Sequence, residues 1–258
     1  MGSVGKTSSS TPSGASAKVN TMNAFDFAKD MDSSAMSTAE QRAAVQQLQN
    51  EMGQTGDEAG RIDVAGRQKL YVNTSKAFDI NYFLNTGKVG GSRLSQWTDL
   101  GYDRRMIEQD IRKIDSGMKP MSQPVIGYRY VSAGSLSRML GLGGAADATA
   151  TANSIFNDTS GKTLNAFKNV LKTANYTQNA YTSLSYDKRH STFDAMPIRL
   201  RVVVARGTPA IVTNNHPEHE ILAGRGLKYN FTGDARVVTE RASSSGRNQK
   251  YLEIDVTL

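Results

Sequence analysis

The spacing of apolar side chains predicts helices in the first half of the chain. In residues 41–52, Val45 and Leu48 lie three positions apart among strong helix formers, which places both on one side of a helix. Ser37 and Glu40 precede this stretch at the spacing of a capping box, in which two side chains satisfy backbone N–H groups at a helix start. Similar patterns predict further helices at residues 69–84, 104–114, 136–140 and 164–173.

The second half of the chain favours short strands. Residues 125–131 form a run of mostly β-branched and aromatic side chains that is typical of a buried strand. Shorter runs separated by glycine and asparagine turns predict strands at residues 180–185, 198–205, 210–213, 227–231, 236–239 and 251–258. Because helices come early and strands come late, the pattern predicts an α+β fold.

Large apolar residues divide the chain into a leader and one domain. Residues 1–36 are rich in Ser, Thr, Gly and Ala, with too few large apolar groups to offset the entropy of ordering them. We expect this leader to be flexible. Residues 37–258 are long enough for one ordinary domain, with a helical part at 37–120 and a sheet-rich part at 121–258.

Composition excludes several classes of protein. The chain has no cysteine, which excludes disulfides and thiolate metal sites. Its formal net charge of +7 could indicate a nucleic-acid partner, but acidic residues are interspersed with the basic ones, so nucleic acid is not the partner we expect. No apolar run approaches the roughly 20 residues that span a bilayer, and the N-terminus lacks the apolar core of a signal peptide. We therefore expect a soluble protein.

Three short stretches carry the candidate chemistry. Glu218 and Glu220 stand one residue apart, so in an extended segment both carboxylates point to the same face and can serve one pocket. A solvated surface strand would also carry such a pair. Arg129 lies in the predicted buried strand, where an arginine needs an anionic partner. Ser183 and Ser185 share one face of a second strand.

Arginine, then Ser-x-Ser, then Glu-x-Glu resembles the arginine-type mono-ADP-ribosyltransferases, the R-S-E class of NAD-using bacterial toxins and phage enzymes. The resemblance covers roughly residues 61–258. Tyr71, followed by Asn81 after an isoleucine, looks like the N-terminal helical signature of this family. The stretch at 193–202 is similar to the family's loop with a nicotinamide-facing aromatic, here Phe193, and to its next core strand.

The chain departs from the family pattern at two positions. Leu184 replaces the middle threonine of the usual Ser-Thr-Ser, at a position whose side chain points away from the site. Many relatives carry a basic residue near Met196 to meet the phosphates of NAD. In this chain the resemblance leaves that role to Arg189 or Arg199.

The resemblance implies a fold and an activity. The fold would have N-terminal helices and two small, roughly perpendicular, mostly antiparallel sheets around an NAD cleft. The activity would be transfer of ADP-ribose from NAD to an exposed arginine of a target protein, with release of nicotinamide. The leader has no signal peptide, so the expected place of action is a target cell, after synthesis there or after injection.

The resemblance also assigns roles to single residues. Glu220 would bind the ribose 2′-hydroxyl and stabilise the positive charge that develops on the ribose, while Glu218 would face the acceptor arginine. Arg129 would bind the pyrophosphate, because its planar fork of donors matches phosphate oxygens. Ser183 would hold the carboxylate of Glu220, and Phe193 would stack on nicotinamide.

Some candidates keep a second interpretation. Ser185 and Asn81 are candidate NAD-binding residues, but short polar side chains just as often satisfy nearby backbone groups. His216 and His219 lack the spacing of a zinc motif, so we expect no metal. The glycines at 141–146 match a dinucleotide loop in letters, but a predicted helix precedes them where that loop requires a strand.

Two other functions remain open from the sequence. An NAD glycohydrolase on the same scaffold would use water in place of the acceptor. A basic structural or nucleic-acid-binding protein would use the net charge, although it would leave Glu218 and Glu220 unexplained.

Overall fold

The computed structural model describes residues 23–54, 76–90, 102–189, 193–212 and 219–258. The described helices are the 3₁₀-helix η1 (Ala24–Asp26) and the α-helices α1 (Thr38–Glu51), α3 (Lys76–Thr86), α4 (Arg104–Gly117), α5 (Ala133–Leu140), α6 (Ala145–Asn157) and α7 (Lys162–Thr173). The described strands are β1 (Lys119–Pro120), β2 (Val125–Val131), β3 (Tyr176–Gln178), β4 (Thr182–Ser185), β5 (Ile198–Val204), β6 (Pro209–Val212), β7 (Glu220–Ala223), β8 (Leu227–Arg241) and β9 (Asn248–Thr257).

The strands form one hydrogen-bonded series in the order β1-β6-β7-β4-β2-β5-β9-β8-β3. β5 and β9 run parallel, and the other described neighbours run antiparallel. The α+β class is therefore confirmed. The expected division into two sheets is not confirmed, because hydrogen bonds connect all nine described strands.

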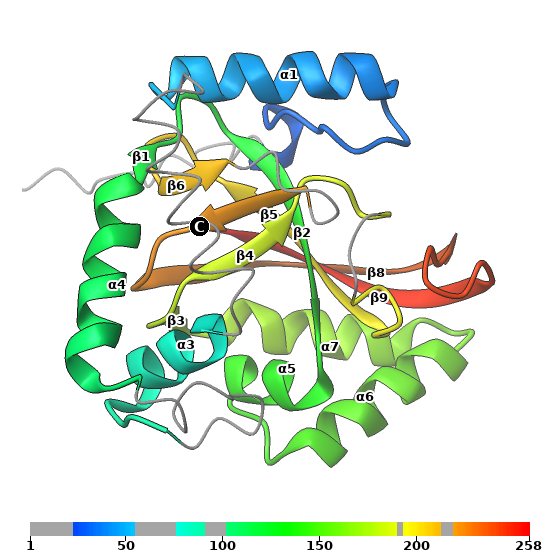
Figure 1. Cartoon of the computed structure of the whole chain (residues 1–258). Helices are drawn as coiled ribbons and strands as arrows, with labels where there is room; N and C mark the ends of the chain where they lie inside the picture. The colour runs from blue at the N-terminus through cyan, green and yellow to red at the C-terminus, as the bar shows by residue number, and fades with distance from the viewer. Residues whose placement is uncertain (1–22, 55–75, 91–101, 190–192, 213–218) are drawn as a thin grey trace, which may run out of the picture.

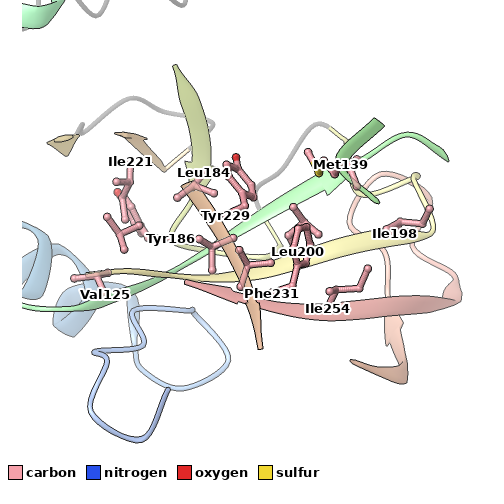
Figure 2. Packing of buried hydrophobic residues seen from close by; sticks show 14 of the residues in the cluster. Val125, Met139, Leu184, Tyr186, Ile198, Leu200, Ile221, Tyr229, Phe231 and Ile254 are labelled. Carbon is pink, nitrogen blue, oxygen red and sulfur yellow. The ribbon is translucent and has the colours of Figure 1, made fainter. Parts of the chain in front are cut away.

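Helices surround this sheet, and those of one group share its main apolar core, whereas α3 and α4 pack into a second, smaller cluster. In Figure 1, α1 lies above the sheet, α5, α6 and α7 lie together below it, and α4 runs along the side near β1. Buried residues of α1 and of α5 to α7 belong to the same apolar cluster as the strands. Figure 2 shows part of this core, which contains Met139 of α5 and side chains of several strands; those labelled include Leu184, Leu200, Ile221 and Ile254.

Several predicted elements are confirmed close to their predicted bounds. β2 occupies residues 125–131 as predicted. The capping box of α1 is present, because the Ser37 hydroxyl accepts a hydrogen bond from the Glu40 N–H and the Glu40 carboxylate accepts one from the Ser37 N–H. The helix predicted at 69–84 lies outside the described residues up to residue 75, and α3 begins at Lys76.

Residues 23–36 pack against the domain, although the sequence predicts a flexible leader through residue 36. Phe25 is buried beside Ile126 of β2, and Met31 is fully buried in the main core. Lys29 forms an isolated parallel bridge to Val125. The expectation for this part of the leader is corrected, because two large apolar side chains are enough to anchor it once a core exists to receive them. The remainder of the predicted leader, residues 1–22, lies outside the described residues.

Two buried aspartates secure the end of this segment. The Asp32 carboxylate accepts a hydrogen bond from the Lys188 N–H at 3.0 Å, and the Asp187 carboxylate accepts one from the Ser33 N–H at 3.2 Å. The side chain of Gln41 also donates to Asp187, at 3.0 Å. Burial opposes ionisation of Asp187, but the hydrogen bonds from Ser33 and Gln41 outweigh it and lower its pKa to about 2.

Deleting residues 1–34 should therefore destabilise the protein. The deletion removes Phe25 and Met31 from the core, and burial of each such side chain is worth about 1.5–3 kcal/mol. We expect a lower midpoint of thermal unfolding, measured by circular dichroism. A deletion of residues 1–22 keeps all these contacts and serves as the matched control. Equal midpoints for the two deletions would show that the packed segment contributes nothing to stability.

Candidate active site

A large cavity lies where two central strands separate. β2 and β4 pair through the single residue pair Tyr128–Ser185, whereas β4 pairs with β7 along its whole length. The cavity has a volume of about 1070 Å³, at the upper end for small-molecule sites. Its wall includes six of the candidates from the sequence: Asn81, Arg129, Ser183, Ser185, Phe193 and Glu220. Glu218 lies outside the described residues.

Glu220 is a buried carboxylate in the cavity wall. It is the first residue of β7 and only 1% exposed. In strand register it lies opposite Ser185, while Ser183 lies opposite Leu222, one diagonal step away. Glu220 thus pairs with β4 at the end of its strand, whereas β6 pairs with β7 only from Ile221 onward.

Arg129 reaches the cavity from β2 and is held by a tyrosine. Its guanidinium donates a hydrogen bond of 2.9 Å to the hydroxyl of Tyr229, a fully buried residue of β8. The same hydroxyl lies 2.9 Å from the Thr182 hydroxyl on β4. A guanidinium has five N–H donors in a fixed plane, so the bond to Tyr229 helps to orient that plane.

The two serines of β4 differ in their surroundings. The Ser185 hydroxyl donates to the Asp187 carbonyl at 2.6 Å and accepts from the Asp187 N–H at 3.2 Å, which closes a local turn. The sequence left two roles open for Ser185, NAD binding and hydrogen bonding to nearby backbone groups. The structure shows the hydrogen bonds to backbone groups. Ser183 is half-buried in the cavity wall.

Phe193 is exposed at the cavity, on a loop that hydrogen bonds hold against the β8–β9 hairpin. The ring is 51% exposed, whereas the next residue, Asp194, is buried. One carboxylate oxygen of Asp194 accepts hydrogen bonds from the backbone N–H groups of Ser243 and Ser244, and the Tyr251 hydroxyl donates to its carbonyl. The β8–β9 hairpin thus anchors the loop that presents Phe193.

Neither arginine suggested by the sequence for the phosphates lines the cavity. Arg199 is 1% exposed and binds Glu253 and Glu240. Burial alone would lower the pKa of Arg199, but hydrogen bonding to Glu240 and the charge of Glu253 raise it above the usual value. Arg189 donates instead to the hydroxyl of Ser33. Both arginines support the packing of neighbouring segments.

A cavity arginine that the sequence analysis missed is Arg138. It lies on α5, is exposed, and contacts the Ser135 hydroxyl at 3.3 Å. Among the described residues that line the cavity, Arg129 and Arg138 are the basic side chains and Glu220 is the acidic one. On a helix an exposed arginine resembles any solvated residue, so no spacing signal marks Arg138. Only the tertiary structure brings it to the same wall as Arg129.

The structure gives no sign of a metal site within its described residues, where no three His, Asp or Glu side chains are grouped to hold an ion. Of the two histidines considered, His216 lies outside that part of the chain, and His219 stacks on the ring of Tyr186. None of the described helices is both long and apolar enough to cross a membrane.

Solved structures that share this fold include ADP-ribosyltransferase toxins. C3stau2 from S. aureus, solved with NAD, superposes with a TM-score of 0.57 at 17% identity, covering 83% of this chain and 94% of that one. BECa of a C. perfringens binary enterotoxin, solved with NADH, superposes with a TM-score of 0.58 at 15% identity. The match covers 86% of this chain but only 48% of the BECa chain. Plx2a from Paenibacillus larvae superposes with a TM-score of 0.54 at 15% identity, and the match covers 84% of this chain and 93% of the Plx2a chain.

The chain belongs to the ADP-ribosyltransferase exoenzyme family, whose model matches residues 64–258. No curated protein matches it by sequence. The low identities to the solved structures establish the shared fold, and the family match establishes the kind of domain. The suspected relationship to toxin-type ADP-ribosyltransferases is thereby confirmed.

Proposed function

We propose that this protein cleaves NAD at the bond between nicotinamide and ribose and transfers ADP-ribose to arginine side chains of a target protein. The observation that carries the proposal is the arrangement of charged side chains, since the buried Glu220 lines the same cavity as Arg129 and Arg138. A dinucleotide with a doubly charged diphosphate suits two guanidiniums. Related structures that contain NAD or NADH on the same fold support NAD as the substrate.

Glu220 is assigned to the bond-breaking step. Loss of nicotinamide leaves positive charge on the ribose ring, and a fixed carboxylate close to that ring stabilises the charge as in glycoside cleavage. A hydrogen bond from the ribose 2′-hydroxyl to Glu220 would strengthen as the charge grows. The exposed ring of Phe193 offers a stacking surface for nicotinamide.

Glu218 is assigned to the acceptor. The arginine guanidinium is protonated at physiological pH and is a weak nucleophile, so a neighbouring carboxylate must orient it and accept a proton during attack. This assignment rests on the family resemblance, since Glu218 lies outside the described residues and His219, between the two glutamates, is left-handed and not extended as the sequence argument assumed. We place the reaction in a target or host cell, in keeping with the toxin relatives.

Incubation with labelled NAD and bacterial or eukaryotic lysate tests the activity and finds the target. Transfer predicts a labelled protein band in which mass spectrometry finds modified arginines. Free ADP-ribose without modified protein would support an NAD glycohydrolase instead. Modification confined to another residue type would overturn the arginine specificity.

Both cavity arginines should affect NAD binding. A charge-assisted hydrogen bond is worth about 1.5–3 kcal/mol, so Arg129→Lys and Arg138→Ala should each raise the KM for NAD by about tenfold or more. Arg206→Ala, an exposed arginine that does not line the cavity, is the control and should leave the KM unchanged. An unchanged KM in Arg138→Ala would remove that residue from the site. The same result in Arg129→Lys would make Arg129 a packing partner of Tyr229.

A further inference from the structure

The residue immediately before Glu220 has an unusual backbone conformation. His219 has a φ of 47° and is the one non-glycine residue of the described chain with a positive φ. This left-handed region is disfavoured for residues with a Cβ atom and is usually filled by glycine. Surrounding contacts must therefore hold His219 in place.

Tyr186 supplies these contacts. Its N–H donates to the His219 carbonyl at 2.8 Å, and its ring stacks on the imidazole with centroids 5.0 Å apart and an interplanar angle of 29°. Both side chains are buried, and Tyr186 belongs to the same apolar cluster as Ile221. Because Tyr186 directly follows Ser185, the two contacts extend the strand pairing by one position beyond Glu220.

The left-handed turn lies directly before Glu220, the first residue of β7. Successive side chains of a strand alternate between its faces, so a change of phase at the start of β7 would turn the carboxylate away from the cavity. A glycine would permit the turn but would also permit many other conformations. A histidine whose ring is fixed against Tyr186 restricts the chain to this one.

We propose that His219, held by Tyr186, is a positioning residue that aims the Glu220 carboxylate into the cavity. The proposal rests on the proposed function of Glu220. It assigns to His219 no contact with substrate, so its loss should affect turnover and not NAD binding.

Four variants test the proposal through steady-state kinetics of NAD cleavage. His219→Val, whose branched side chain opposes the left-handed conformation, should lower kcat by about a hundredfold, the effect of a small misplacement of a reacting group. Its KM for NAD should stay within about twofold. His219→Asn tolerates this conformation but loses the stacked ring, so its kcat should fall less than that of His219→Val and about as far as that of Tyr186→Leu. Tyr186→Leu should lower kcat because the stacking is lost, and Tyr186→Phe, which keeps the ring, is its matched control.

Several outcomes would overturn the positioning role. These are a wild-type kcat in His219→Val, or equal losses in His219→Val and His219→Asn. Should His219→Val fail to fold by circular dichroism, the comparison of Tyr186→Leu with Tyr186→Phe decides: equal kcat values refute the role. Absence of NAD cleavage by the wild-type protein would count against the proposed function itself. In that case a crystal structure of His219→Asn or Tyr186→Leu shows whether the Glu220 carboxylate still points into the cavity. An undisplaced carboxylate in Tyr186→Leu would refute the inference.

Discussion

In the Glu220→Gln variant, NAD cleavage and transfer of ADP-ribose should both fall by at least about 10²–10³-fold, the loss typical for removing one electrostatic contact to a transition state. Glutamine has nearly the same shape as glutamate, so the packing of a side chain that is 1% exposed should survive. The variant removes the negative charge that would stabilise the developing positive charge on the ribose. Single-turnover nicotinamide release measures the loss, and calorimetry should show nearly unchanged NAD binding.

Glu253→Gln is the matched control for this experiment. Glu253 is also buried, but it binds Arg199 and Arg236 and does not line the cavity. Its substitution should lower thermal stability, since it breaks a buried ion pair, while the folded protein keeps its turnover. Wild-type turnover in Glu220→Gln would contradict the assigned mechanism.

In the Glu218→Gln variant, transfer to arginine should be lost while NAD hydrolysis remains measurable. Glu218 is assigned to the acceptor and not to NAD, so the ribosyl cation can still form and react with water. The two activities are followed in one reaction by mass spectrometry, with a small guanidine acceptor present. The expected result is free ADP-ribose without modified acceptor.

Other results for Glu218→Gln would change the account in defined ways. A parallel loss of both activities, as in Glu220→Gln, would show that Glu218 is also needed to bind or activate NAD. Retention of both would show that Glu218 is a solvated neighbour and that arginine is not the acceptor.

Elements with strong local periodicity could be predicted from the sequence, and elements defined by small residues or irregular strands could not. α6 was missed because its buried stripe begins with Ala148 and Ala152, whose small side chains give little hydrophobic contrast. Two predicted strands are one strand, β8, because the register shifts between Phe231 and Ala235 around Gly233, which has a φ of 85°. A glycine at such a position reads as a turn in sequence.

The candidate site shows the same division. The described residues of the three motifs, Arg129, Ser183, Ser185 and Glu220, line one cavity. Strand alternation and strand pairing, which the sequence pattern reflects, bring them there. Arg138 and the packed segment at 23–36 were not predictable, since both depend on contacts between distant parts of the chain. The Asp32–Lys188 contact, for example, joins residues 156 positions apart.

The central claim is that this cavity splits NAD and passes ADP-ribose to a guanidine. Purified protein incubated with NAD and agmatine, followed by mass spectrometry, tests it directly. We predict release of nicotinamide and formation of ADP-ribosylated agmatine in the wild-type reaction, and at least about 10²-fold less of both products in Glu220→Gln. Absence of nicotinamide release from the folded wild-type protein, together with salt-dependent DNA binding, would contradict the account and favour a nucleic-acid-binding role.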